Sequence, residues 1–188
     1  RQRQMCIRDR DYNDVRVYID MGKMIYGFIE KIYMFFVELL FKIIRKDLTD
    51  KTRQTFKEFL QFGLVGVSNT VVSYLLYVVT LVLVSKSGVT FDYIIANVVS
   101  WVLSVLWSFY WNNKFVFKKE EGEHRNIWAA LFKTYVSYGF TGLILNNVLS
   151  VIWVSVLHVS KMIAPIINLI INIPINFFLN KIWAFGKK

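Results

Sequence analysis

The sequence predicts an all-α integral membrane protein in which four transmembrane helices form two parallel helix-pair repeats, preceded by an interfacial amphipathic helix. Composition, the spacing of charged residues and the distribution of lysine and arginine carry this prediction. Of the 188 residues, 55% are hydrophobic and only 19% are charged, whereas a soluble domain has roughly 45 to 50% apolar residues and about a quarter charged ones. The chain is too apolar for an ordinary soluble domain, and too rich in aromatic and branched side chains to stay disordered.

Charged residues leave two long apolar stretches in the second two thirds of the chain. The only ionisable side chains are Lys86 and Asp92 in residues 59–113, and His158 and Lys161 in residues 134–180, tyrosines aside. The hydrocarbon core of a bilayer is about 30 Å thick and is crossed by roughly 20 helical residues. Each stretch therefore divides into two spans, which we predict at residues 60–84, 93–112, 133–156 and 162–181.

Lysine and arginine set the expected orientation. Of the 23 basic residues, 21 lie before the first span, in the central loop or after the fourth span. We expect a multi-pass protein of the cytoplasmic (inner) membrane, and the positive-inside rule places both termini and the central loop in the cytoplasm. Topology accounts for the net charge of +10, so we expect no nucleic-acid partner.

The N-terminal part is predicted as two segments. Residues 1–20 are expected to be non-native or disordered, because the first ten show no pattern that continues into the rest. Residues 21–50 are expected to form a cytoplasmic amphipathic helix in the membrane interface, because the charged positions of residues 21–46 fall within an arc of roughly 160°. A partner-binding helix and a fifth span are the alternatives.

A weak internal repeat relates the two helix pairs. The start Phe59-x-x-Phe62-x-x-x-Gly66 recurs as Phe132-x-x-Tyr135-x-x-x-Gly139. The ends also match, since Asn113-Lys114 with the following Phe117 is similar to Asn180-Lys181 with the following Phe185. These matches predict a parallel repeat with its axis along the membrane normal.

Those endings, together with Phe62, Gly66 and Asn69 of the first span, resemble the GtrA-like family of small four-span membrane proteins. Its domain also occurs beside dolichol-phosphate or polyprenyl-phosphate sugar synthases, and the resemblance covers residues 56–186. It implies a role in moving, or helping to use, a lipid-linked sugar in cell-surface polysaccharide synthesis. It implies no catalytic residue.

Uncharged polar residues inside the predicted spans are the candidates for lining a polar cleft. Asn168, Asn172, Asn176 and Asn180 recur at a spacing of four in the fourth span and form one stripe around Pro174. Such amides are costly in lipid, so they either bind neighbouring helices together or line a polar pathway. The residues we assign to a polar cleft for the sugar are Asn69, Asn97, Ser104, Asn113, Asn146, Asn172, Asn176, Asn180 and Trp101.

Three lysines are the candidate phosphate ligands. Lys114 and Lys181 end the second and fourth spans at matching repeat positions, and Lys57 precedes the first span. They are expected to neutralise the phosphate of a polyprenyl-phosphate sugar while its tail stays in lipid. The alternative is that they are interface anchors whose charged ends reach the aqueous boundary.

No enzyme pattern is found in the sequence. It has no glycine-rich phosphate loop, no cluster of metal ligands and no nucleophile beside a histidine, and its one cysteine is Cys6. We therefore expect a protein that is not an enzyme and needs no cofactor or metal. The predicted function is flipping of a polyprenyl-phosphate-linked monosaccharide. The alternatives are a non-transporting scaffold for a membrane glycosyltransferase and a small-solute transporter, and a homodimer would enlarge the room for a sugar.

Overall fold

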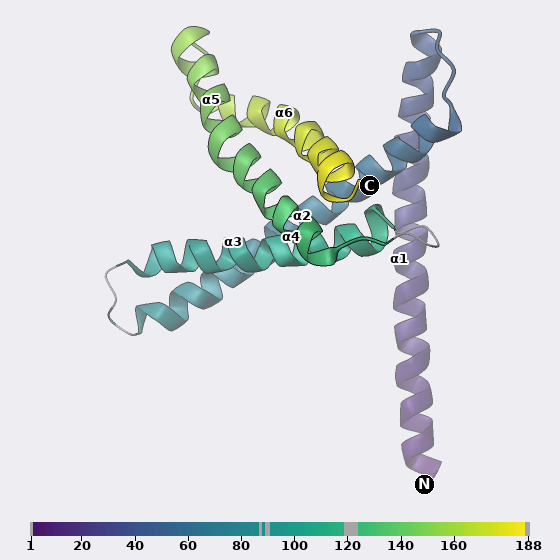
Figure 1. Ribbon diagram of the computed structural model, residues 1–188. Coiled ribbons are helices and arrows are strands. Elements are labelled where there is room, and N and C mark those ends of the chain that lie inside the picture. Colours follow the sequence, from purple (N-terminus) through teal and green to yellow (C-terminus); the bar gives the residue numbers. More distant parts are fainter. Residues whose placement is uncertain (1, 87, 89–90, 119–123, 187–188) are drawn as a thin grey trace. The chain divides into compact units, whose positions relative to one another are not determined.

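A computed structural model describes residues 2–86, 88, 91–118 and 124–186, and it is helical throughout with no strand in these ranges. The chain divides into two compact units, residues 1–60 and residues 61–188. Figure 1 labels the α-helices, and π-helical turns (η) interrupt or end several of them. The elements are α1 (Gln2–Ile43), α2 (Asp50–Ser85), α3 (Asp92–Trp111), η1 (Asn112–Val116), α4 (Ile127–Gly139), η2 (Phe140–Leu145), α5 (Asn146–Val151), η3 (Ile152–Val156), α6 (Ala164–Phe178) and η4 (Leu179–Ala184).

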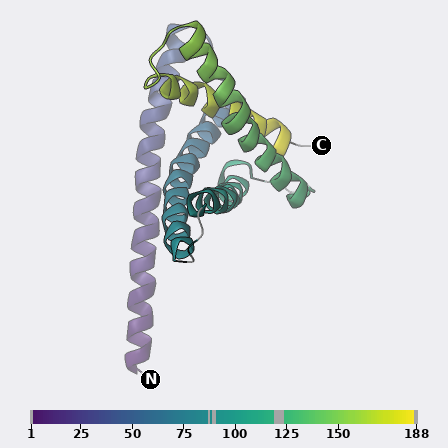
Figure 2. The same ribbon diagram turned by 90° about the vertical axis from the view of Figure 1, so that its left-hand side faces the viewer.

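Four helices are long and apolar enough to cross a membrane. They are Asp50–Ser85, Asp92–Val116, Ile127–Val156 and Ala164–Ala184. Three of the predicted spans lie inside these helices and the fourth starts two residues before its helix, so the prediction of four spans is confirmed. In both views the third of these helices continues through η2 and η3 without a break (Figure 1, Figure 2).

The N-terminal helix is longer than the predicted amphipathic segment. The structure has one helix from Gln2 to Ile43, and α2 begins already at Asp50. The prediction that residues 1–20 are non-native or disordered stays a prediction. The amphipathic segment itself lies on α1, with exposed Met24, Phe28 and Phe36 among its apolar side chains.

The second unit has an apolar surface and an interior that combines polar and apolar side chains. Its large apolar side chains are mostly exposed, for example Val71 and Leu143, which is the surface that acyl chains cover. The buried polar residues are Ser100, Ser104, Ser108, Asn112, Thr134, Ser137, Thr141, Asn168 and Asn180. Small side chains at these positions let helices approach closely.

Several buried hydroxyls donate to carbonyls of their own helix. Thr134 Oγ1 donates to the Ala130 carbonyl at 2.9 Å, and Ser104 Oγ donates to the Trp101 carbonyl at 3.1 Å. Hydroxyl groups can therefore be buried inside the unit without an unpaired donor.

Side-chain hydrogen bonds join α3 to both of its neighbours. Trp107 Nε1 on α3 donates to Ser68 Oγ on α2 at 3.1 Å. Tyr135 Oη on α4 donates to the Val102 carbonyl on α3 at 2.6 Å. Side-chain hydrogen bonds thus fix α3 between α2 and α4.

Candidate functional site

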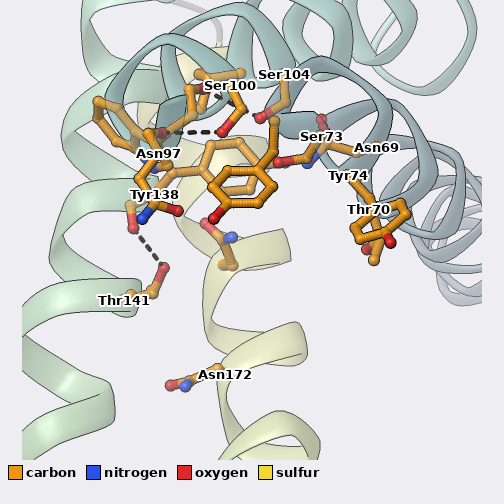
Figure 3. A pocket seen from close by; sticks show the side chains of 15 residues that line it. Asn69, Thr70, Ser73, Tyr74, Asn97, Ser100, Ser104, Tyr138, Thr141 and Asn172 are labelled. Atoms are coloured by element: carbon orange, nitrogen blue, oxygen red, sulfur yellow. Dashed lines mark hydrogen bonds between the residues drawn. The ribbon is translucent and has the colours of Figure 1, made fainter. Parts of the chain in front are cut away.

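An open, uncharged pocket of about 640 Å³ lies in the second unit, between the two helix pairs. Residues from α2 and α3 line one side and residues from α4, η2 and α6 the other, and Figure 3 shows their side chains converging. The lining is Asn69, Thr70, Ser73, Tyr74, Tyr77, Asn97, Ser100, Trp101, Ser104, Val105, Tyr138, Thr141, Gly142, Asn172 and Asn176. Amides, hydroxyls and aromatic rings predominate, and none of these residues is charged.

Six of the nine predicted cleft residues lie in this pocket. They are Asn69, Asn97, Trp101, Ser104, Asn172 and Asn176. The structure therefore brings together residues from the first, second and fourth predicted spans.

The pocket offers free hydrogen-bond acceptors. Asn69 Oδ1 and Asn172 Oδ1 are buried and have no partner among the described residues. The hydroxyl groups of Ser100 and Thr70 donate to carbonyls of their own helices. Their oxygen atoms can therefore accept a hydrogen bond from a ligand. A ligand with several hydroxyl donors fits this lining.

Asn146 and Asn168 have a different role from the pocket residues. The Asn168 amide nitrogen donates to the Asn146 carbonyl, to Asn146 Oδ1 and to Ser150 Oγ at 2.8 to 3.1 Å. Asn172 Nδ2 lies 3.5 Å from the same Asn146 Oδ1. Asn146 and Asn168 therefore join α5 to α6. For this part of the asparagine stripe, the amides bind neighbouring helices together and do not line a polar pathway.

Asn180 and Asn113 lie outside the pocket, at the ends of spans. Asn180 is fully buried, and its amide nitrogen donates to the carbonyl of Asn176, a pocket residue, at 2.8 Å. Asn113 Oδ1 accepts a bond from Arg125 Nη1 at 3.2 Å. Asn180 is thus connected to the pocket, whereas Asn113 is tied to the segment that precedes α4.

The two repeat endings are the same π-helical turn. The Phe117 amide donates to the Asn112 carbonyl at 2.8 Å, and the Phe185 amide donates to the Asn180 carbonyl at 2.8 Å. Asn112, and not Asn113, is therefore the structural counterpart of Asn180. The sequence match pairs Asn180 with Asn113, one position away from its structural counterpart, because it aligns the lysines and not the π-helical turns.

The predicted phosphate lysines do not line the pocket. Lys114 is exposed, its Nζ lies 3.2 Å from Tyr110 Oη, and it sits 5.4 to 5.7 Å from the centroids of three aromatic rings. Lys181 Nζ lies 5.7 Å from the centroid of the Phe177 ring. Both positions suit cations anchored among interface aromatics, and a phosphate role stays a prediction.

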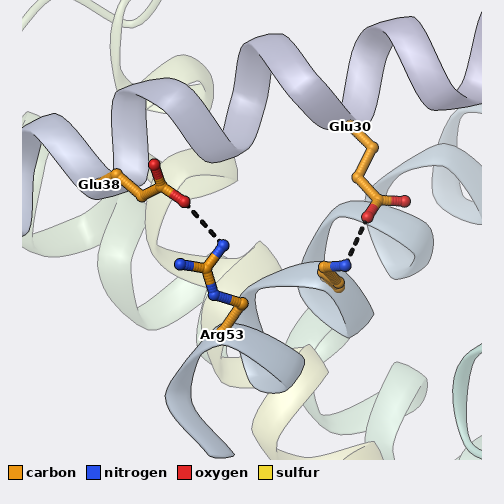
Figure 4. A network of polar contacts seen from close by, with 4 residues as sticks. Glu30, Glu38 and Arg53 are labelled. Atoms are coloured by element: carbon orange, nitrogen blue, oxygen red, sulfur yellow. Dashed lines mark hydrogen bonds and ion pairs between the residues drawn. The ribbon is translucent and has the colours of Figure 1, made fainter. Parts of the chain in front are cut away.

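Lys57 belongs to an ion-paired hairpin within the first unit. Its Nζ lies 2.8 Å from Glu30 Oε1, and Arg53 Nη1 lies 2.7 Å from Glu38 Oε1 (Figure 4). The hydrogen bond from Lys57 lowers the pKa of Glu30 against an opposing effect of burial. Lys57 is thus already paired with a carboxylate. A phosphate would have to displace Glu30 in order to bind it, which disfavours Lys57 as a phosphate ligand.

The sequence reasoning missed the tyrosines of the pocket. Tyr77 continues the spacing of four that starts with Asn69 and Ser73, so it was open to detection. Tyr138 lies in the middle of a span, where an aromatic hydroxyl needs a partner, and it bonds Ser108 Oγ at 2.8 Å. A tyrosine deep in a span was the available signal.

Fold and site together define a multi-pass membrane protein with an uncharged polar pocket between two helix pairs. The family model described as GtrA/DPMS, transmembrane domain, matches residues 61–185, two thirds of the chain. The chain belongs to this family. No curated protein and no solved structure matches it.

Proposed function

We propose that this protein flips a polyprenyl-phosphate-linked monosaccharide across the cytoplasmic membrane, for cell-surface polysaccharide or glycan biosynthesis. The observation that carries the proposal is the uncharged, acceptor-rich pocket between the helix pairs. Sugar hydroxyls donate to amide and hydroxyl oxygens, and aromatic rings such as Trp101 and Tyr74 cover the apolar faces of a sugar ring. Membership in the GtrA/DPMS family supports a lipid-linked sugar as the ligand.

The phosphate and the lipid tail are proposed to stay outside the pocket. Anionic groups are strongly disfavoured in an apolar interior without a counter-charge, and no lysine or arginine lines the pocket among the described residues. Lys114 and Lys181, at the ends of their helices, would meet the phosphate there. In this proposal the protein performs no covalent chemistry and uses no cofactor, and its termini face the cytoplasm.

A scaffold for a membrane glycosyltransferase is the second candidate. The exposed apolar residues of α1, such as Phe28 and Phe35, favour it because they offer a surface for another protein or for lipid. A homodimer is compatible with either function.

Reconstitution into liposomes tests the proposal. Polyprenyl-phosphate glucose, radiolabelled in the sugar, is placed in both leaflets, and a membrane-impermeant periodate solution oxidises the outer pool. With a flippase the protected inner pool becomes accessible over time, whereas protein-free liposomes keep it protected. If purified protein leaves the inner pool protected, flipping is excluded under these conditions and the scaffold is favoured.

A further inference from the structure

We propose that the two π-helical endings form a second binding position for the sugar, which is closed in this conformation by stacked phenylalanines. This inference rests on the flipping function proposed above and adds a second site to it. The site comprises Asn112 and Asn180 as acceptors, Phe117 and Phe185 as the gate, and Arg125 as the residue that holds the gate shut.

The two endings are built alike and touch each other. Each is a π-helical turn closed by one backbone hydrogen bond, from Phe117 to Asn112 and from Phe185 to Asn180. The rings of Phe117 and Phe185 stack with centroids 4.8 Å apart. π-helical turns occur frequently at functional sites. Each repeat has one such turn at the same end of the unit, which also carries Lys114 and Lys181 and which we call the lysine end.

Both asparagines carry an unused acceptor. Asn112 and Asn180 are fully buried, and neither Oδ1 has a hydrogen-bond partner among the described residues. An unpaired buried polar group costs about 1 to 3 kcal/mol. In the proposed open state, the sugar satisfies both of these acceptors, which lie at equivalent positions of the repeat.

Hydrogen bonds lead from the pocket to each asparagine. Asn176 lines the pocket, and Asn180 Nδ2 donates to its carbonyl at 2.8 Å and to its Oδ1 at 3.2 Å. On the other repeat, Tyr138 lines the pocket and bonds Ser108 at 2.8 Å, which in turn accepts from Asn112 Nδ2 at 3.1 Å. Polar groups therefore run from the pocket to both endings, which is the path a sugar would need.

Phenylalanines close this path between the pocket and the lysine end. Phe62, Phe109 and Phe177 join the Phe117–Phe185 stack, and all five rings are buried. Along their helices, Phe109 follows the pocket residue Ser104, and Phe177 follows the pocket residue Asn176. The pocket is thus closed toward the lysine end.

Arg125 bridges the two endings. Its Nη1 donates to the Phe117 carbonyl at 2.8 Å and to Asn113 Oδ1 at 3.2 Å, while its guanidinium lies 5.3 Å from the centroid of the Phe185 ring. One side chain therefore binds both sides of the stack. Release of Arg125 lets the endings separate and exposes amide acceptors beside aromatic rings, a combination that suits a hydroxylated sugar ring.

Cross-linking the gate tests the inference. Phe117→Cys and Phe185→Cys are introduced together in a Cys6→Ser background, and a short reducible thiol cross-linker joins them, with intact mass as the measure of linkage. We expect sugar translocation in liposomes to fall at least tenfold on cross-linking and to recover on reduction, with no such change in either single-cysteine protein. Translocation that is equally fast in the linked protein, or a pair that does not link, overturns the gate.

A second variant keeps the inference testable if the cysteine pair is inactive. Asn112→Leu with Asn180→Leu should slow translocation at least tenfold, whereas the exposed Asn147→Leu, outside the pocket and the endings, should not. The melting temperature checks that the double variant folds like the unmodified protein. If the unmodified protein does not translocate, the proposed function fails; if it does and the double variant matches it, only the second site fails.

Discussion

The asparagine stripe of the fourth span divides among three environments. Asn168 binds α5 through three hydrogen bonds, Asn172 and Asn176 line the pocket, and Asn180 sits in a π-helical turn. A spacing of four predicts that these residues share one face. It does not predict what each of them meets, because that depends on where α5 and the first helix pair end along α6.

Asn168→Leu should destabilise the protein without stopping translocation. Interhelical hydrogen bonds in membranes average about 0.6 kcal/mol and reach about 1.7 kcal/mol, so we expect the free energy of unfolding to fall by about 1 to 2 kcal/mol. Unfolding in mixed micelles, followed by tryptophan fluorescence, measures it. Unchanged stability with lost translocation would instead place Asn168 on the sugar path.

Lys114→Ala with Lys181→Ala tests the phosphate role. Charge-assisted hydrogen bonds contribute about 1.5 to 3 kcal/mol, so losing both cations should weaken binding of polyprenyl-phosphate glucose at least tenfold. Binding to protein in nanodiscs measures the affinity, with Lys86→Ala, in the loop between α2 and α3, as the control. An affinity equal to that of the control would identify both lysines as interface anchors only.

At the scale of elements, the first unit adds two ion pairs to the predicted amphipathic helix. A helical wheel predicts that the charged face of α1 meets water, and Glu30 and Glu38 on this face are partly exposed. The same two carboxylates also pair with Lys57 and Arg53 at the start of α2. The helical wheel identifies the charged face of α1 correctly. It does not predict the basic partners on α2, because sequence periodicity carries no information about tertiary contacts.

The pH dependence of this hairpin follows from Glu30. Since its pKa is lowered below 4.5 in the folded state, chiefly by the hydrogen bond from Lys57, the contact is fully stabilising above pH 4.5 and is lost as the pH falls through the lowered pKa. Both side chains are partly exposed, so the pair contributes at most about 1 kcal/mol. Spin labels at Ile25→Cys and Lys51→Cys, in a Cys6→Ser background, report the separation of the helices.

Glu30→Lys should broaden the distance distribution at pH 7, and adding Lys57→Glu should restore it. The matched control is Asp47→Asn, which changes a carboxylate outside the two ion pairs. A distribution that is unchanged by Glu30→Lys would show that the hairpin does not depend on this pair.

At the scale of the whole molecule, the number of spans was predictable, because charge is excluded from hydrocarbon. Two helix starts were not, since α2 begins at Asp50 and α4 at Ile127, before the predicted residues 60 and 133. Six cleft residues were also found, since an uncharged polar residue in a span must face the protein interior. Asn113 was paired with Asn180 because the match aligned the lysines. The equal spacing of five residues from Asn112 to Phe117 and from Asn180 to Phe185 was the signal that pairs Asn112 with Asn180. Tyr138 and Arg125 were missed because their partners come from other helices.

The positive-inside orientation predicts which loops face the cytoplasm. In a Cys6→Ser background, His124→Cys in the central loop should resist a membrane-impermeant maleimide added to intact cells. Lys86→Cys, in the loop between α2 and α3, should react, and cell lysis should expose the first site as well. The reverse pattern would invert the topology.

The central claim is that the uncharged pocket carries the sugar across the membrane. The most direct measurement is the leaflet-exchange rate of polyprenyl-phosphate glucose in liposomes containing Asn69→Leu with Asn172→Leu, compared with Asn147→Leu and the unmodified protein. Two lost hydrogen bonds of about 1 kcal/mol each predict a roughly 30-fold slower exchange for the pocket variant, and unchanged exchange for Asn147→Leu. Equal rates in all three proteins would contradict the claim.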